Sequence, residues 1–329
     1  MSALAPTLEA FFTERLMSQK RASRHTIAAY RDAFRLLLVF AQQRSGKPPS
    51  CLDFDDLDAP LVGAFLEDLE QARGNSARSR NARLAAIHSL FRFAALRHPE
   101  HAALIARVLA IPTKRFDRTI VSFLDHPETD ALLAAPDRGR WIGRRDHALL
   151  AVAIQTGLRV SEFTGLRCQD VQLGAGAHVR CLGKGRKQRC TPLNTQTAEV
   201  LCVWLQERTG QPNDPLFPTS RGRSLSRDAV ALLVVNNAKV AAQHCPTLRN
   251  KIVSPHTLRH TCAMNLLHSG VDPAVIALWL GHENLRSVES YVHADITLKE
   301  RALARTAPVG TIPGRYRPPD SLIGFLEAL

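Results

Sequence analysis

The stretch HVRCLGKGRKQRCTPL, residues 178–193, carries the one good strand signal in the chain. Two short strand-like runs flank a Gly-Lys-Gly turn, which is typical of an antiparallel hairpin. The residues before and after this stretch instead place apolar side chains at helical spacing. The sequence therefore predicts a mainly α fold with a small β-hairpin or sheet.

The first hundred or so residues read as helices. Residues 23–42 place apolar side chains at helical spacing after Ser23, a typical capping residue, and the breaker SGKPPS follows them. A second helix, PLVGAFLEDLEQA, stops at Gly74, and a third starts near Ser76. We expect an all-helical N-terminal domain over residues 1–109.

A second helical pattern begins after a polar, basic stretch that contains a proline, AIPTKRFDRT (110–119). This composition is typical of a linker. Asp125 is a good cap for the first helix of a larger, mostly helical domain over residues 120–305. The tail, residues 306–329, combines a loop-like stretch with a short apolar helix, SLIGFLEAL.

The charge balance favours a polyanionic partner. Lys and Arg total 43 against 30 acidic residues, a formal net charge of +13, and such an excess is typical of proteins that bind nucleic acid. A basic protein without such a partner remains the alternative. Seven side chains in the third helix, the linker and the hairpin turn are candidate phosphate contacts or simply solvated charges: Arg78, Arg80, Arg83, Lys114, Arg115, Arg186 and Lys187.

The cysteines and the N-terminus indicate a cytoplasmic protein. The seven cysteines are scattered without a CxxC pair, which favours free thiols in a reducing compartment. The first residues lack the basic start, apolar run and cleavage site of a signal peptide. The longest apolar runs, such as residues 36–41, are far too short to span a membrane.

The stretch HTLRH places His256, Arg259 and His260 close together on one helix. A zinc site is one reading, with Glu283 as a third ligand. The hydrolytic motif HExxH requires a glutamate where this chain has Thr257, so the general base would be missing. A DNA-phosphate clamp and an ordinary polar helix are the other readings. The Gly-Lys-Gly turn also lacks the Walker A pattern, which excludes a P-loop there.

Metal-independent attack on a DNA phosphodiester needs residue types that this chain supplies. Arginines can bind phosphate oxygens bidentately and keep their charge. A lysine beside other cations can act as an acid, and histidine transfers protons near neutral pH. A tyrosine nucleophile would need cationic neighbours that favour its phenolate, because its usual pKa is about 10.

Five motifs in order resemble the tyrosine recombinase family of phage integrases, Xer recombinases and transposon-encoded integrases. Each motif is weak alone, but their order and spacing together are specific, and the resemblance spans residues 120–300. The N-terminal segment resembles the family's DNA-clasping domain only in character. The motifs are TGLRVSEFTGL (156–166), GKGRKQR (183–189), HTLRH (256–260), LGHENLRS (280–287) and SYVHAD (290–295).

The resemblance implies a catalytic set of Arg159, Lys184, His256, Arg259, His282 and Tyr291. The two arginines would clamp the phosphate, the lysine would protonate the leaving 5′ oxygen, and Tyr291 would be the nucleophile. His256 would handle the proton of the nucleophile, and His282 would hydrogen-bond the phosphate. Glu162 would brace the first arginine, and His260 would bond to backbone and hold the helix of the second.

The family implies strand transfer through a 3′-phosphotyrosyl link, with no cofactor and no metal. It further implies a two-domain C-shaped clamp around double-stranded DNA and a homo-tetramer that brings two recombination sites together. The terminal apolar helix would dock on a neighbouring protomer. Integration or excision of a mobile element and Xer-like resolution fit equally, with or without a partner recombinase or accessory protein.

Two other functions are open at this point. A type IB topoisomerase would use similar chemistry to relax a single duplex, although the linear two-domain layout favours a recombinase. A non-catalytic DNA-binding relic would be expected to have lost at least one of the six catalytic residues, and this chain keeps all six.

Overall fold

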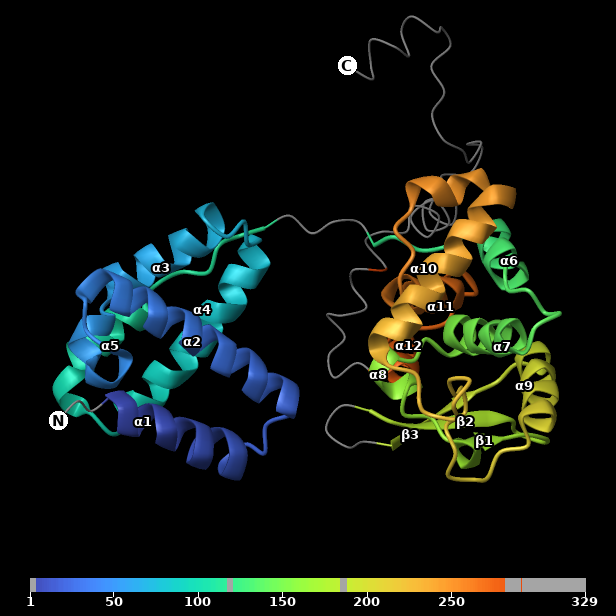
Figure 1. Cartoon of the computed structure of the whole chain (residues 1–329), viewed down its shortest axis with the longest axis horizontal. Coiled ribbons are helices and arrows are strands. Elements are labelled where there is room, and N and C mark those ends of the chain that lie inside the picture. Colours follow the sequence, from blue (N-terminus) through green and yellow to red (C-terminus); the bar gives the residue numbers. More distant parts are fainter. Residues whose placement is uncertain (1–3, 117–120, 184–187, 282–290, 292–329) are drawn as a thin grey trace, which may run out of the picture. The chain divides into compact units, whose positions relative to one another are not determined.

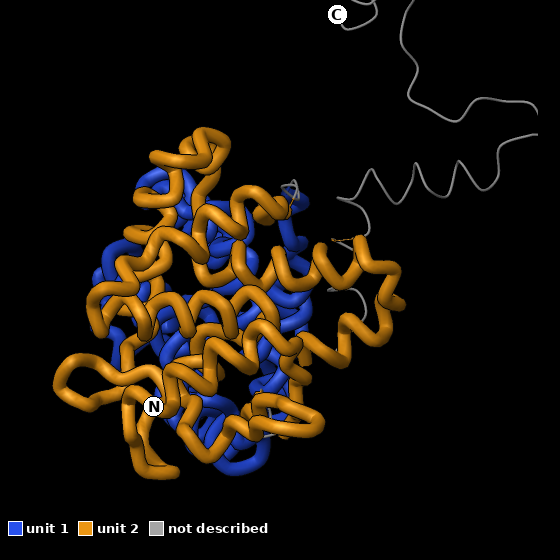
Figure 2. The backbone as a smooth tube through the Cα atoms, turned by 90° about the vertical axis from the view of Figure 1, so that its right-hand side faces the viewer, with its two compact units in different colours: residues 1–118 blue, residues 119–329 orange. Residues whose placement is uncertain are grey.

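The computed structural model describes residues 4–116, 121–183, 188–281 and 291 of the chain. The backbone divides into two compact units, residues 1–118 and residues 119–329 (Figure 2). We describe each unit by itself. Within the described ranges, no helix combines the length and apolar character that crossing a membrane requires.

Unit 1 is all-helical, as the sequence predicts (Figure 1). Ser23 accepts a hydrogen bond from the Thr26 backbone N–H and caps the second helix, which ends at Gly46 in the left-handed conformation. Ser76 caps the fourth helix in the same way. The helices are α1 (Leu4–Ala10) with a π-helical continuation (Phe11–Gln19), α2 (Arg24–Ser45), α3 (Ala59–Gln71), α4 (Ala77–Ala95) and α5 (Ala102–Leu109).

The core of unit 1 is rich in phenylalanine. Phe11 is fully buried and contacts Phe34 edge-on, and Phe40 packs against Phe65 between α2 and α3. Burial of such rings, each with a large apolar area, is the main favourable contribution to folding. Unit 1 therefore has a hydrophobic core of its own.

The start of the expected linker packs against unit 1. The Arg80 guanidinium donates to the Pro112 carbonyl at 3.1 Å. The Asn81 side chain donates to the Lys114 carbonyl at 2.8 Å and accepts from the Lys114 N–H at 3.0 Å. Residues 111–114 are thus fixed to α4, whereas the sequence predicts a free linker from residue 110.

Unit 2 is mostly helical, with its small sheet at one end (Figure 1). Asp125 and Glu128 form the capping box that starts its first helix, so the predicted cap is confirmed. The helices are α6 (His126–Ala134), α7 (Trp141–Thr156), α8 (Val160–Phe163), α9 (Thr195–Arg208), α10 (Arg227–His244), α11 (Pro255–His268) and α12 (Pro273–Leu280).

The sheet contains the predicted hairpin and one more strand. Strands β2 (His178–Leu182) and β3 (Gln188–Pro192) pair antiparallel, with Cys181 opposite Arg189. The short strand β1 (Val171–Gln172) adds to the other edge of β2, which gives the order β1-β2-β3. The mainly α architecture with a small antiparallel sheet is therefore confirmed.

Two glycines bring α7, α11 and α12 close together. Gly157 ends α7 with φ of 61°, and a Cβ at this position would lie 2.6 Å from Leu280 and 3.0 Å from the Cys262 sulfur. Gly281 ends α12 with φ of 63°. Glycine is favoured at both ends because it adopts positive φ without strain. The helices α7 and α12 therefore end just before two of the expected catalytic residues, Arg159 and His282.

Candidate active site

Arg159 is the N-cap residue of α8, and Glu162 is the third residue of that helix. The Glu162 carboxylate accepts from the Arg159 backbone N–H at 2.8 Å and from its guanidinium Nη1 at 2.9 Å. The other terminal nitrogen of Arg159 donates to the Gly281 carbonyl at 2.9 Å. The side chain of Arg159 remains 31% exposed, which leaves part of the guanidinium available to a ligand.

Arg259 lies one turn into α11 and is only 4% exposed. Its guanidinium donates to the Gly157 carbonyl at 2.6 Å and to the Leu280 carbonyl at 2.7 Å. Within the described ranges no carboxylate forms an ion pair with it. Burial, and next the charge of Arg159, lower the pKa of Arg259 to about 10. The guanidinium remains charged at neutral pH in a site short of negative charge.

Arg189 on β3 completes this group of cations. Its guanidinium binds Glu162 through two parallel hydrogen bonds of 3.0 and 2.8 Å. Burial by itself would raise the pKa of Glu162, but the bonds from Arg189 and Arg159 hold that pKa below its ordinary value. Arg159 and Arg189 pair with the ionised Glu162, and Arg259 lies close enough for its pKa to respond to all three charges. Three arginines near one carboxylate give an excess of positive charge that suits a bound phosphate diester.

Tyr291 is 3% exposed and packs in an apolar cluster with Cys262 of α11 and Leu280 of α12. Its hydroxyl lies 2.9 Å from Nδ1 of His260, and the two rings meet edge-on at 5.4 Å. The backbone bond expected for His260 is therefore wrong. His260 shares a face of α11 with His256, and the contact with Tyr291 uses its Nδ1.

The acid–base properties of this pair differ from the expected ones. Burial raises the pKa of Tyr291 above its ordinary value, although Arg259 and Arg159 act in the opposite direction. Burial, and next the charges of His256 and Arg259, lower the pKa of His260 to about 4. Among the described residues, desolvation outweighs the two arginines and favours the neutral phenol. Lys184, the third cation expected to favour the phenolate, lies outside the described residues, so that preference stays a prediction.

The remaining predicted catalytic residues are placed as follows. His256 is exposed near the start of α11, and its ring centroid lies 6.1 Å from that of His260. Lys184 and His282 lie outside the described residues, as do Arg186 and Lys187. The structure thus brings together Arg159, Arg259 and Glu162, and joins Tyr291 to this group through α11 and α12.

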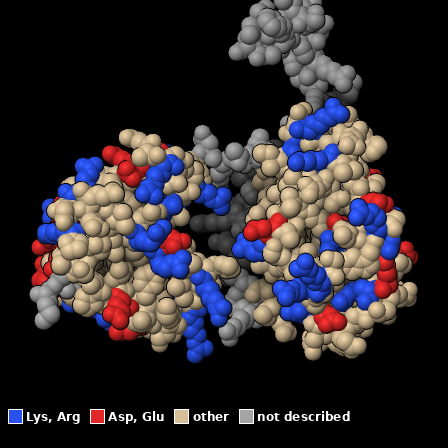
Figure 3. Space-filling view, in the orientation of Figure 1, with Lys and Arg blue, Asp and Glu red and all other residues tan. Residues whose placement is uncertain are grey.

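The basic residues of unit 1 behave in two ways. Arg78, Lys114 and Arg115 are exposed and Arg83 is half-buried, and basic side chains gather in patches on the presented face of each unit (Figure 3). Arg80, in contrast, is 7% exposed and lies beside Glu70. The guanidinium of Arg80 fixes the chain at Pro112 within unit 1, and its contact with DNA stays a prediction.

Sequence reasoning missed the role of Arg189, although the quoted motif GKGRKQR includes it. The signal was the period of two along β3, in which Arg189 and the buried Thr191 share one face while Gln188 and Cys190 are exposed. A charged residue at an inward position of a strand usually has a partner. That partner, Glu162, is 27 residues earlier, which no local pattern can identify.

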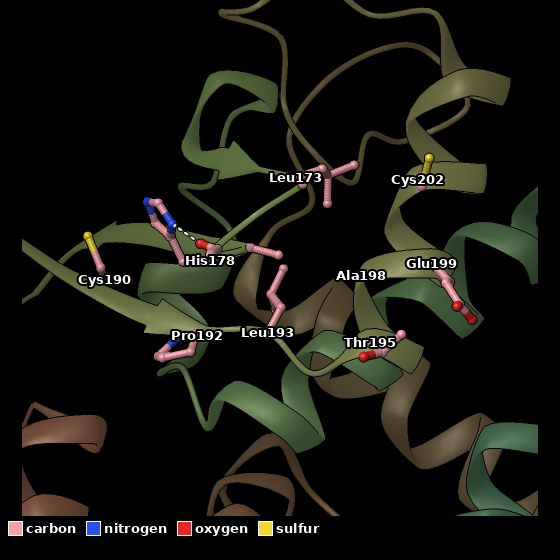
Figure 4. Close-up of a pocket in the computed structure, with 12 residues that line it drawn as sticks. Leu173, His178, Cys190, Pro192, Leu193, Thr195, Ala198, Glu199 and Cys202 are labelled. Atoms are coloured by element: carbon pink, nitrogen blue, oxygen red, sulfur yellow. Dashed lines mark hydrogen bonds between the residues drawn. The ribbon is translucent and has the colours of Figure 1, made fainter.

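A separate cavity of about 740 Å³ lies beside β2, β3 and α9. Figure 4 shows His178 with its ring bonded to a backbone oxygen, together with Leu173, Leu193 and Cys202. No residue of the predicted catalytic set lines this cavity. Within the described ranges, no three His, Cys, Asp or Glu side chains are grouped closely enough to hold a metal ion.

Comparison with known proteins identifies the family. Residues 122–297 match the model of the phage integrase family, and residues 10–98 match the phage integrase N-terminal SAM-like domain. The integrase/recombinase y4rC of Sinorhizobium fredii is 55% identical over 328 residues, 100% of this chain and 99% of that protein. Tyrosine recombinase XerC of Pelobacter propionicus is 33% identical over 286 residues, 87% of this chain and 90% of that protein.

Solved structures share the fold. The XerH site-specific recombinase in a post-cleavage complex with its palindromic difH substrate aligns with a TM-score of 0.68 at 22% identity, over 89% of this chain and 83% of that chain. The Tn1549 transposon integrase with transposon right end DNA aligns with a TM-score of 0.67 at 15% identity, over 91% and 98%.

The chain belongs to the phage integrase family. It is a tyrosine recombinase, an enzyme of site-specific DNA recombination.

Proposed function

We propose that Tyr291 cuts DNA by attacking the scissile phosphate in line with the 5′ oxygen. The Tyr291 oxygen forms a bond to phosphorus, and the bond from phosphorus to the 5′ oxygen breaks. The phenol proton passes to His256, and Lys184 gives a proton to the leaving 5′ oxygen. The 3′-phosphotyrosyl link keeps the energy of the broken bond. A 5′ hydroxyl of a partner duplex then reverses the reaction and joins new strands.

Arg159 and Arg259 clamp the non-bridging oxygens in this proposal, with His282 as a further donor. The observation that carries it is the burial of Arg259 beside two more arginines, with no carboxylate of the described residues ion-paired to it. A phosphate diester supplies the negative charge that this group lacks. Fixed donors aimed at developing charge are often the largest single contribution to a rate enhancement.

The pairing of Tyr291 with His260 adds a step before cleavage. A buried phenol with a raised pKa must reach the phosphate before it can attack. With a pKa of about 4, His260 is neutral at physiological pH and is a weak base. We assign it the task of holding the Tyr291 hydroxyl, and the exposed His256 the task of accepting the proton.

Unit 1 and the basic connection hold the duplex in this proposal. Exposed and half-buried basic residues on α4 and after it are the contacts we assign to phosphates, because such contacts position a protein on DNA without reading sequence. The contacts are Arg78, Arg83, Lys114 and Arg115, together with Arg186 and Lys187 in the hairpin turn. We propose that both units contact the duplex and that four protomers join two recombination sites.

The biological reaction is the movement of a mobile element or Xer-like resolution. The relative y4rC, 55% identical to this chain, is named an integrase/recombinase, and the Tn1549 enzyme, which shares the fold, is a transposon integrase. We place this chain with the enzymes that insert or excise an element, and we expect its sites at the ends of that element.

A suicide-substrate assay tests the mechanism. Purified protein is mixed, in EDTA, with nicked DNA from the flanks of its genetic element, and covalent protein–DNA complexes are separated by denaturing electrophoresis. We expect a covalent band with the wild type and none with Y291F. A band that survives in Y291F, or cleavage that needs added Zn²⁺ or Mg²⁺, would overturn the proposed nucleophile or the metal-free chemistry.

A further inference from the structure

Glu162 is saturated by two arginines from different elements. Each of its carboxylate oxygens accepts one bond from Arg159 and one from Arg189, over 2.8 to 3.0 Å. A carboxylate offers about four acceptor positions, so this one has no unused capacity. Its side chain is 4% exposed, which leaves little room for water to replace a lost donor.

The two arginines bind Glu162 in different ways. Arg189 forms a fork in which its two terminal nitrogens each reach one oxygen. Arg159 uses its backbone N–H for one oxygen and a single guanidinium nitrogen for the other. Because Arg189 occupies both carboxylate oxygens in the forked geometry, Arg159 cannot form a bidentate pair with Glu162. Such a pair would neutralise the charge of Arg159 and turn its guanidinium toward the carboxylate.

Arg189 also lies against the C-cap of α12. A Cβ added at Gly281 would be 2.6 Å from Nη1 of Arg189 and 3.0 Å from its Cζ. The carbonyl of the same glycine accepts from Arg159. The guanidinium of Arg189 therefore contacts α8 through Glu162. It also lies beside Gly281, whose carbonyl accepts a hydrogen bond from Nη2 of Arg159. It does so from β3, the strand that follows the turn containing Lys184.

We propose that Arg189 is a positioning residue for strand cleavage: its fork on Glu162 holds Arg159 open toward the scissile phosphate and fixes the β2–β3 hairpin beside it. This inference rests on the proposed function of Arg159 and extends it to a residue that touches neither phosphate nor nucleophile. A lysine at position 189 would keep the positive charge but could not hold Glu162 in this way, because it cannot bind both carboxylate oxygens in parallel.

The test compares R189M and R189K with the wild type in single-turnover cleavage of a suicide substrate at saturating DNA. Both variants should lose rate by about tenfold to 100-fold, since small displacements of a positioning group have effects of this size. DNA affinity should change by less than about threefold, because Arg189 is not a DNA contact in this proposal. R180M is the matched control, since Arg180 lies on β2 with an exposed side chain bonded to the Gln169 carbonyl.

A double-mutant cycle with R159K separates positioning from general stability. If Arg189 acts through Arg159, R189M should lower the rate much less in the R159K background than in the wild type. Equal losses in both backgrounds, or full activity of R189K, would overturn the inference. Melting temperatures of all variants identify any loss that comes from unfolding, and R189K keeps the charge should R189M fold poorly.

The two proposals fail separately in this design. A wild-type covalent complex that disappears in Y291F but forms at the wild-type rate in R189M would overturn the positioning role alone. A complex that persists in Y291F would overturn the proposed nucleophile. The ratio of the wild-type rate to the R189M rate would still test the positioning role of Arg189.

Discussion

Arg80 in unit 1 and Arg259 in unit 2 are both buried, and they differ in what surrounds the charge. Arg80 in unit 1 is 7% exposed, and Arg259 in unit 2 is 4% exposed. Both donate to backbone carbonyls. Arg80 has Glu70 at 3.9 Å, whereas Arg259 has two other arginines and a lowered pKa. Burying a charge is costly unless it is paired, so Arg80 fits a structural role and Arg259 a role that a bound anion completes.

The largest expected effect comes from exchanging the two arginines for methionine. R259M should lower the single-turnover cleavage rate by about 100-fold to 1000-fold, the cost of losing one donor to developing charge. R80M should leave that rate nearly unchanged but lower the free energy of unfolding by about 1–3 kcal/mol, because the Pro112 carbonyl and Glu70 lose a partner.

Cleavage assays and thermal unfolding of both variants check this contrast. The contrast between the two arginines would be wrong if R259M lost as much stability as R80M and its loss of cleavage were fully explained by the smaller fraction of folded protein. Arg259 would then be a structural residue.

Two glycines with nearly equal backbone angles sharpen the comparison. Gly74 and Gly281 have φ of 62° and 63°, but a Cβ at Gly74 would meet nothing within 4 Å, whereas one at Gly281 would meet Arg189. Both alanine variants should lose about 1–2 kcal/mol of stability from the left-handed backbone. G281A alone should also lose cleavage, by about tenfold or more.

Calorimetry and single-turnover cleavage of G74A and G281A measure the two effects. Equal cleavage by both variants would show that the surroundings of Gly281 tolerate a displaced guanidinium and do not set the rate.

The smallest expected effect is a pH dependence of stability from His260. The pKa of an unfolded histidine is about 6.5, and the folded value is about 4. Between these values the unfolded state binds the proton that the folded state does not. The stabilisation is therefore complete above the unfolded pKa and is lost as pH falls toward 4.

The melting temperature of the wild type should fall more steeply from about pH 7 to about pH 5 than that of H260Q, by a few degrees. H126Q, at an exposed histidine, is the matched control and should keep the wild-type slope. Parallel curves for the wild type and H260Q would contradict the burial of a neutral His260.

The sequence predicted the local features well because their causes are local. Ser23, Ser76 and Asp125 each cap the helix that follows them. The hairpin follows from its turn. Strand β1 was missed because its two residues are too few to show the alternation of buried and exposed side chains that indicates a strand.

Contacts between distant residues were beyond the same reasoning. Arg80 reads as one of several cations at the start of a helix, and its carbonyl partner is 32 residues away. His260 reads as a support for its own helix, yet its partner Tyr291 is 31 residues away. Motif order pointed to Arg159, Arg259 and Tyr291 as members of one site, but only the packed structure gives the burial that shifts their pKa values.

The burial of Tyr291 has a consequence for how this enzyme loses activity. The ring packs against Cys262 and Leu280, and its hydroxyl bonds to His260. A change to phenylalanine keeps the ring and removes one oxygen atom. Under the proposed role of Tyr291, the product would be a folded protein that occupies the recombination site without cutting it. A mobile element that encodes this substitution would therefore produce a protein that competes with the active enzyme for the same DNA. A minority of such chains in a cell would inhibit recombination, because each can take a place in the proposed tetramer.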